Sequence, residues 1–396
     1  MGGAYVAVAE DLLALFYNPA GLAQVRRVEF YGDLARFFSQ SDTKFFGTVA
    51  SDRLSNTRLS SCGLILPYPT YRGSLVFAGG FVRPFMFDMV VKVRGYDTIE
   101  RFDTQGGILE EGWLGAYSFG FAVDVAPSLS LGAAINIYDG DDLYAERSTF
   151  SDTRLDAHPD TVSLFARRTF RDEYNGRNFT LGALIGGAHR FRVGVTIVTP
   201  VTYEVTSDFE DEFIDEYIDR QDVFEPAGFS YAYRLRHPFR FGLGVSCLPI
   251  HRLLIAGAVY STGWPQTEYI EQRPPRDGEL SDIPVRVEDF RQQYRYEVRY
   301  HIGGEFLIPK VDLLFRTGYY NDPVVFVGPR HLSEESSPKI DVVRDGRVIT
   351  GGVGMLVGQV LDLNVAYAIG QMVVREGHRD EERTTQKIFW STAYRF

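Results

Sequence analysis

Large apolar residues alternate with small or polar residues along much of this chain. Residues 129–138, LSLGAAINIY, place leucine, alanine and isoleucine at every second position, with serine, glycine, alanine, asparagine and tyrosine between them. The segments 113–125, 361–370 and 384–396 repeat this pattern. Side chains of a β-strand point alternately to opposite faces of the sheet. Each segment therefore predicts a strand with one large apolar face.

The second face of these predicted strands is small rather than charged. A soluble β-sandwich covers its solvent face with long charged side chains, and that fold is the alternative to weigh here. Small residues on one face and large apolar residues on the other are typical of a transmembrane barrel, whose outward band contacts lipid. The side chains that we predict to point to lipid are Leu131, Ile135, Leu363, Tyr367, Trp390 and Tyr394.

Short and long connections alternate between the predicted strands. The short ones are residues 67–72, 126–128, 188–190, 248–252, 308–310 and 358–360. The long polar ones are residues 39–57, 96–111, 140–177, 207–228, 271–290, 326–346 and 377–383. Bacterial outer-membrane barrels have short periplasmic turns and long external loops, so this alternation predicts about fourteen strands.

Composition and charge exclude several other classes of protein. The 396-residue chain is rich in glycine (39), tyrosine (23) and phenylalanine (30), and no apolar run is long enough for a transmembrane helix. Its net charge of −11 argues against a nucleic-acid partner. We found no hydrolase elbow, zinc-protease, P-loop or Cys-x-x-Cys motif, and the seven histidines show no ligand spacing. The sequence therefore predicts no enzyme, no cofactor and no metal site.

The N-terminal motif carries a family resemblance. Residues 2–22 read GGAYVAVAEDLLALFYNPAGL, directly before the first predicted strand at residue 28. This motif resembles the N-terminal plug of the FadL/TodX family, which transports long-chain fatty acids and other hydrophobic compounds across the bacterial outer membrane. The last strand ends in Tyr-Arg-Phe, which resembles the assembly signal of outer-membrane proteins.

The resemblance implies an all-β fold and two parts of the chain. Residues 1–27 would form a short plug, or hatch, in the lumen, and residues 28–396 an antiparallel transmembrane β-barrel of about 14 strands with long external loops. We expect residues 1–25 to fold back inside the barrel, with a tight turn at Asn18-Pro19. The residues assigned to the plug and the ligand path are Leu15, Phe16, Asn18, Pro19, Ala20 and Gly21.

The third predicted strand carries a candidate lateral gate. In the family, ligand leaves sideways into the membrane at a kink in the third strand, and a kink needs residues that weaken a β-ladder. Here the strand reads GSLVFAGGFVRPFMFDMVV from Gly73, and Gly79, Gly80 and Pro84 are such residues. The alternative is a bend that only helps the barrel to close.

Residues 207–225 suggest an external groove. Phe209, Phe213 and Tyr217 recur at helical spacing among carboxylates, which predicts an amphipathic helix outside the membrane. Its apolar stripe would form one wall of a landing groove for hydrophobic ligand, with Leu164 and Phe165 on the other wall. A capping helix packed on the barrel rim is an equal alternative.

Two functional hypotheses follow. The first is passive transport of long-chain fatty acids or other hydrophobic small molecules through a plugged outer-membrane barrel, with lateral exit near the third strand and with the lipid bilayer and lipopolysaccharide as surroundings. The second is an interaction protein, similar to plugged barrels of the PorV type, that serves secretion or attachment of other outer-membrane or secreted proteins. A lumen pocket beside an interrupted third strand favours the first hypothesis, and a sealed barrel favours the second.

Overall fold

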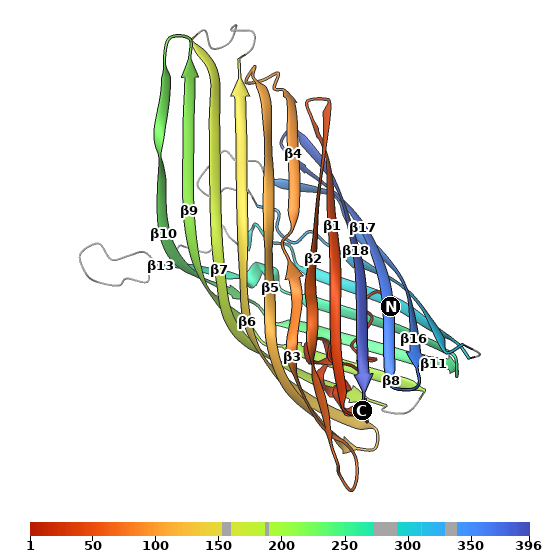
Figure 1. The fold of residues 1–396 in the computed structure, drawn as a ribbon. Coiled ribbons are helices and arrows are strands. Elements are labelled where there is room, and N and C mark those ends of the chain that lie inside the picture. The colour runs from red at the N-terminus through yellow and green to blue at the C-terminus, as the bar shows by residue number, and fades with distance from the viewer. Residues whose placement is uncertain (153–159, 187–189, 273–290, 310, 329–338) are drawn as a thin grey trace.

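The described strands form one closed antiparallel barrel (Figure 1). The computed structural model describes residues 1–152, 160–186, 190–272, 291–309, 311–328 and 339–396. The first nine strand segments are β1 (Glu29–Phe45), β2 (Thr48–Tyr68), β3 (Leu75–Met86), β4 (Met89–Tyr96), β5 (Asp103–Ala126), β6 (Leu129–Ser151), β7 (Thr161–Ile185), β8 (Phe191–Val198) and β9 (Val201–Tyr217). The next nine are β10 (Gln221–His237), β11 (Arg240–Ile250), β12 (Leu253–Thr262), β13 (Glu268–Gln272), β14 (Glu297–Ile308), β15 (Leu313–Asp322), β16 (Ile340–Val357), β17 (Leu361–Glu376) and β18 (Arg379–Arg395).

Eighteen described segments build fourteen barrel strands, because four barrel strands are each interrupted once. β3 and β4 both pair with β5, and together they make the third barrel strand. In the same way β8 continues into β9, β10 into β11, and β12 into β13. β1 and β18 close the barrel along a register that runs from Glu29 opposite Arg395 to Phe45 opposite Arg379. The predicted fold class and strand number are confirmed.

The inside and outside faces agree with the alternation in the sequence. Five of the six side chains predicted to face lipid, namely Leu131, Leu363, Tyr367, Trp390 and Tyr394, are exposed on the outer surface. Ile135 is half-buried on the same outer row. Between them on β6, Ala134, Asn136 and Tyr138 are buried and face inward. No helix among the described residues is long and apolar enough to cross a membrane.

Several segments that were expected to be long loops are strands. β6 and β7 extend to residues 151 and 161, so much of the expected loop 140–177 is a continuous ladder. The expected loop 39–57 is the end of the β1–β2 hairpin, which turns at Phe46 and Gly47, both with positive φ. A membrane span needs only about 9 to 11 residues. These strands are therefore longer than a membrane span requires, and the polar residues that suggested loops lie on the ladder.

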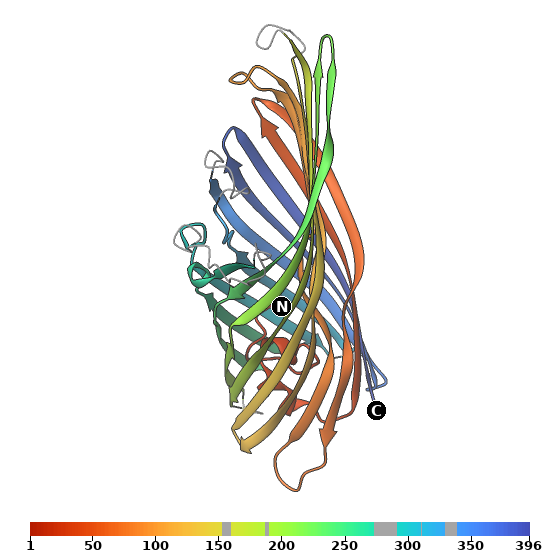
Figure 2. The same cartoon turned by 90° about the vertical axis from the view of Figure 1, so that its left-hand side faces the viewer.

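The barrel is taller on one side than on the other. β5, β6 and β7 have 24, 23 and 25 residues, whereas β14 and β15 have 12 and 10. Figures 1 and 2 show the long strands and the β9–β10 hairpin rising as a curved wall beside the open end of the barrel. The C-terminus lies at the opposite end, near the short turn at 358–360, where the Arg395 N–H donates to the Val360 carbonyl.

Candidate functional site

The N-terminal segment, residues 1–25, lies within the barrel (Figure 1). It contains one turn of helix, α1 (Ala14–Tyr17), and a 3-10 helix, η1 (Pro19–Gln24). Leu12, Leu15 and Leu22 are fully buried. They pack in one cluster with inward residues of the wall, namely Tyr31, Ile65, Val76, Ala78, Ala122, Ala134 and Ala393. The predicted inward fold of the apolar run is thus what the structure has, and its action as a plug stays a proposal.

Small residues of the inner wall let this segment approach closely. A Cβ at Gly132 of β6 would lie 2.4 Å from the Ala20 backbone nitrogen. A Cβ at Gly182 of β7 would lie 2.0 Å from the Asn18 Oδ1 atom. Real side chains do not tolerate such contacts. The glycines on the inner face therefore make room for the backbone of the N-terminal segment rather than for water.

Asn18 joins the segment to itself and to the wall. Its Nδ2 group donates to the Val6 carbonyl at 2.7 Å and to the Ala183 carbonyl of β7 at 3.1 Å. Its Oδ1 atom accepts from the Ala20 N–H at 3.2 Å, which caps η1. Pro19 follows at the first position of η1, where a missing N–H costs no hydrogen bond. Asn18 itself is completely buried, so these three bonds are shielded from water.

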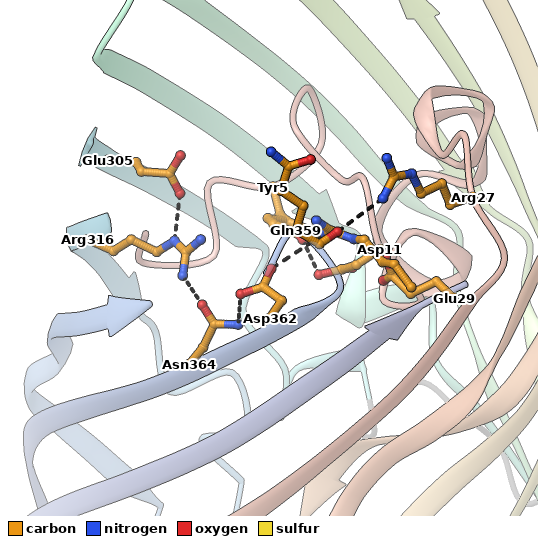
Figure 3. Close-up of polar contacts among 10 residues, drawn as sticks. Tyr5, Asp11, Arg27, Glu29, Glu305, Arg316, Gln359, Asp362 and Asn364 are labelled. Atoms are coloured by element: carbon orange, nitrogen blue, oxygen red, sulfur yellow. Dashed lines mark hydrogen bonds and ion pairs between the residues drawn. The ribbon is translucent and has the colours of Figure 1, made fainter. Parts of the chain in front are cut away.

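Polar contacts surround the segment toward the short-turn end of the barrel (Figure 3). Within the segment, the Tyr5 hydroxyl donates to Asp11 at 2.5 Å, and the Leu13 N–H donates to the same carboxylate. On the wall, Arg316 donates to Glu305 at 2.6 Å and also to Asn364. Burial raises the pKa of Asp11 from 3.8 to about 6, and its two hydrogen bonds oppose that shift.

Aromatic side chains continue the lumen lining above the segment. Tyr17 of α1 lies 6.5 Å from Tyr260, measured between ring centroids, and Tyr260 lies 5.1 Å from His301. His301 stacks on Tyr320 at 5.1 Å. Tyr320 lines a cavity of about 320 Å³, together with Phe37, Phe87, Met89, Asp88 and Lys387 among other residues. This cavity is the candidate ligand chamber.

A second aromatic series leads from the chamber to the tall wall. Phe87 lies 6.0 Å from Tyr174, and the hydroxyls of Tyr174 and Tyr233 both donate to Asp172. From Tyr233 the rings follow one another at centroid separations below 6 Å, in the order Tyr231, Phe229, Phe209 and Phe170. Aromatic residues thus connect the β9–β10 hairpin with the N-terminal segment.

The expected external helix at 207–225 is wrong. These residues form the end of β9, the turn and the start of β10. Phe209 and Phe213 do share one face, and Leu164 lies on that face because its register partner is Asp215. Phe165 lies on the opposite face, opposite Ile214. Tyr217 ends β9, where Arg220 lies over its ring. A depression of about 410 Å³ does border Phe209 and Phe229.

The candidate gate residues occupy two different settings. Gly79 and Gly80 lie in a continuous ladder, opposite Leu64 and Gly63 of β2. A Cβ at Gly80 would come 3.1 Å from the Leu12 side chain, so this glycine makes room for the N-terminal segment. Pro84 lies at a register shift between β3 and β5, two residues after the β2–β3 ladder stops at Val82. Their role as a gate remains a proposal.

Among the described residues, no group of three or more histidine, cysteine, aspartate and glutamate side chains is arranged to hold a metal ion. Cys62 and Cys247 are both free thiols. The sequence reasoning missed Asn56, which donates to Glu111 at 3.2 Å, and Arg58, whose Nη2 atom lies 2.9 Å from the Asp88 Oδ1 atom. Both contacts depend on how the third barrel strand bends. Only Pro84 signalled that bend.

The barrel and the N-terminal segment together define a β-barrel of the membrane type whose lumen is occupied by the segment. Comparison with solved structures finds the same architecture in a FadL homologue of Pseudomonas aeruginosa, with a TM-score of 0.65, 14% identity, and coverage of 100% of this chain and 96% of that one. The toluene transporter TodX of P. putida matches with a TM-score of 0.66 and 12% identity, over 98% of this chain and 94% of that one. The toluene transporter TbuX of Ralstonia pickettii matches with a TM-score of 0.58 and 13% identity, over 98% of this chain and 94% of that one.

The chain therefore has the fold of the FadL/TodX barrels, and the resemblance expected from its N-terminal motif is confirmed at the level of the fold. At identities of 12 to 14% this likeness concerns the fold and not the ligand. No protein-family model and no curated protein matches the sequence.

Proposed function

We propose that this protein carries hydrophobic small molecules across the bacterial outer membrane by passive diffusion. Residues 1–27 act as the plug, and residues 28–396 as the barrel. The ligand meets the aromatic side chains on the inner face of the tall wall, passes along the aromatic series to the chamber, and leaves sideways near the third barrel strand. No energy source is needed, because the ligand moves down its own concentration gradient.

The observation that carries this proposal is the aromatic series from Phe170 to Tyr17. Aromatic rings offer apolar contact without strict directionality, and a ligand pocket is usually lined mainly by such residues. The outer face of the same wall is charged, as at Glu204, Asp208 and Glu210, so the aromatic rings of the inner face are not an extension of the lipid-facing band. Charged side chains such as Asp172 and Asp211 lie between these rings on the inner face. A passage for hydrophobic molecules accounts for an aromatic lining in a part of the barrel that stands above the membrane.

The ligand class is proposed as hydrophobic molecules with or without one carboxylate. The chamber wall includes the cations Lys387, whose Nζ lies 5.5 Å from the centre of the Phe37 ring, and Arg383, together with the carboxylates Asp88, Glu110 and Asp322. Arg383 is paired with Glu381, so Lys387 is the cation that suits the head of a long-chain fatty acid. The solved relatives named as toluene transporters suggest monoaromatic hydrocarbons as the second class to compare. Against the PorV-like alternative stand the chamber and the interrupted third barrel strand beside it.

Uptake by purified barrel in liposomes tests the proposal. Labelled oleate and toluene are presented outside, and their transfer is compared with that of an equally small polar sugar. Phe229→Ala removes an inner ring of the series and should slow hydrophobic transfer. Phe241→Ala removes an outward ring of similar exposure (52% against 59%) and should not. Equal rates for both variants, or no hydrophobic transfer by the unmodified protein, would contradict the proposal.

A further inference from the structure

The third barrel strand leaves its neighbour β2 part of the way up the barrel. The β2–β3 ladder runs from Tyr68 opposite Leu75 to Ser61 opposite Val82. Beyond Val82, β3 shifts register against β5. The strand is then interrupted at Phe87 and Asp88 before β4 begins. β4 pairs with β5. Within the described pairings, β2 before Ser61 has β1 on one side and no ladder to the third barrel strand on the other.

Two side chains of β2, Arg58 and Asn56, bridge this interruption. The Arg58 Nη1 group of β2 donates to the Gly112 carbonyl of β5 at 2.8 Å. Its Nη2 atom lies 2.9 Å from the Asp88 Oδ1 atom, at the break in the third barrel strand. The Gly112 N–H in turn donates to Asp88 at 3.3 Å, and the Phe87 N–H donates to the Gly112 carbonyl at 3.1 Å. Arg58 thus connects β2 with the third barrel strand and with β5. Beside it, the Asn56 Nδ2 group of β2 donates to the Glu111 Oε1 atom of β5 at 3.2 Å, so of these two side chains Arg58 is the one that reaches the third barrel strand.

A side-chain bridge opens differently from a backbone ladder. Ladder hydrogen bonds are held by the regular geometry of two whole strands, whereas a guanidinium can leave by rotation about its own side-chain bonds. The Asp88 side chain is fully buried, and its Oδ2 atom has no hydrogen bond in the described structure. The carboxylate is therefore incompletely satisfied when the bridge is closed. Water that enters on opening would supply the missing hydrogen bonds, which lowers the cost of the open state.

The bridge also borders the chamber. Asp88 and its neighbours Phe87 and Met89 are chamber-lining residues. On the outer side of the same break, Arg83 lies over the ring of Trp113 at 4.6 Å. The break in the third barrel strand at Asp88 therefore borders the chamber.

We propose that Arg58 is a latch: its contacts with Asp88 and Gly112 hold the interruption closed, and a hydrophobic molecule leaves the chamber for the membrane only when they part. This rests on the proposed function, since it names the residue that controls lateral release. Arg58 positions the wall and need not bind the ligand. A purely structural Arg58 would affect the folding of the barrel without changing release from a folded one.

The first test separates binding from release. Arg58→Ala is compared with Arg375→Ala, which removes an arginine paired to Asp380 inside the continuous β17–β18 ladder. Equilibrium binding of a fluorescent fatty acid is measured in detergent, and its transfer into lipid is measured in liposomes. We expect unchanged binding and about tenfold faster transfer for Arg58→Ala, the order expected for loss of one charge-assisted contact. Unchanged transfer in a folded Arg58→Ala barrel would overturn the latch.

A cross-linking test holds even if Arg58→Ala folds poorly. Cys62 and Cys247 are first replaced by serine, and Arg58→Cys is combined with Asp88→Cys. A reducible bis-thiosulfonate reagent about as long as an arginine side chain then joins the two positions. Complete cross-linking should stop transfer into lipid while binding persists, and reduction should restore transfer.

Transfer that continues through a fully cross-linked barrel would place the exit elsewhere and overturn the latch alone. Absence of both binding and transfer in the unmodified protein would overturn the proposed function, and the latch with it.

Discussion

Asn18→Ala should release the N-terminal segment from the wall without unfolding the barrel. The substitution leaves the buried carbonyls of Val6 and Ala183 and the N–H of Ala20 without their side-chain partner. An unsatisfied buried group costs about 1–3 kcal/mol, and not every group stays unsatisfied after relaxation. We expect a loss of about 2–4 kcal/mol in the attachment of the segment. The strands keep all their ladder bonds, so the barrel itself should remain folded.

Two measurements check this prediction. Liposomes with the Asn18→Ala barrel should leak small sugars, and added protease should cut the N-terminal segment faster. Gln24→Ala is the matched control, because it truncates an amide at the end of the same segment that is neither fully buried nor hydrogen-bonded through its side chain among the described residues. The reasoning fails if Asn18→Ala and Gln24→Ala leak equally little in barrels shown to be folded.

Three further predictions concern the segment and the wall. Gly132→Val places a side chain where the Ala20 backbone lies, so it should displace the segment and raise sugar leakage. Gly351→Val should not, because no atom lies within 4 Å of the position that its Cβ would take. Ile135→Arg puts a charge on the lipid face well inside β6, away from the short turn, and should lower the free energy of unfolding by about 2–4 kcal/mol in urea titrations. The pKa of Asp11 in the N-terminal segment is raised to about 6. As the pH falls, Asp11 therefore takes up a proton in the attached segment before it does so in a released one. The attachment of the segment should strengthen between about pH 7 and pH 4, by at most about 3 kcal/mol. Protease-cutting rates should follow this trend, and Asp11→Asn should flatten it; a rate that rises toward acid would contradict the sign.

The barrel could be predicted from the sequence because its walls follow a strict period of two. Small inward residues and large outward residues, such as Ala134 and Leu131, identified both the strands and their faces. The helix expected at 207–225 failed for a geometric reason. Phe209, Phe213 and Tyr217 are four residues apart, and this spacing places side chains on one face of a strand as well as of a helix. In the structure Ile214 distinguishes a strand from a helix, because it lies on the opposite face of the ladder from its neighbour Phe213.

The site could be predicted only in part. The Asn18-Pro19 turn is local, so its sequence signature survives in the structure as the cap of η1. The partner of Asn18 on the wall, Ala183, lies 165 residues away and has no signature of its own. The same is true of Arg58 and Gly112, which meet only because the third barrel strand breaks at Asp88. Contacts of this kind depend on the register between strands, which a single sequence does not contain.

The contacts of the N-terminal segment constrain the order of events during assembly. Residues near Asn18 touch Gly132 and Gly182, whereas Met1 and Gly2 touch Gly303 and Gly318, which come far later in the chain. The binding place of the segment therefore does not exist until strands from both halves of the chain stand in one wall. Contacts so distant in sequence form late in folding. A newly closed barrel should thus pass through a short-lived open state, and residues that precede every barrel strand in the sequence should be among the last to reach their final position.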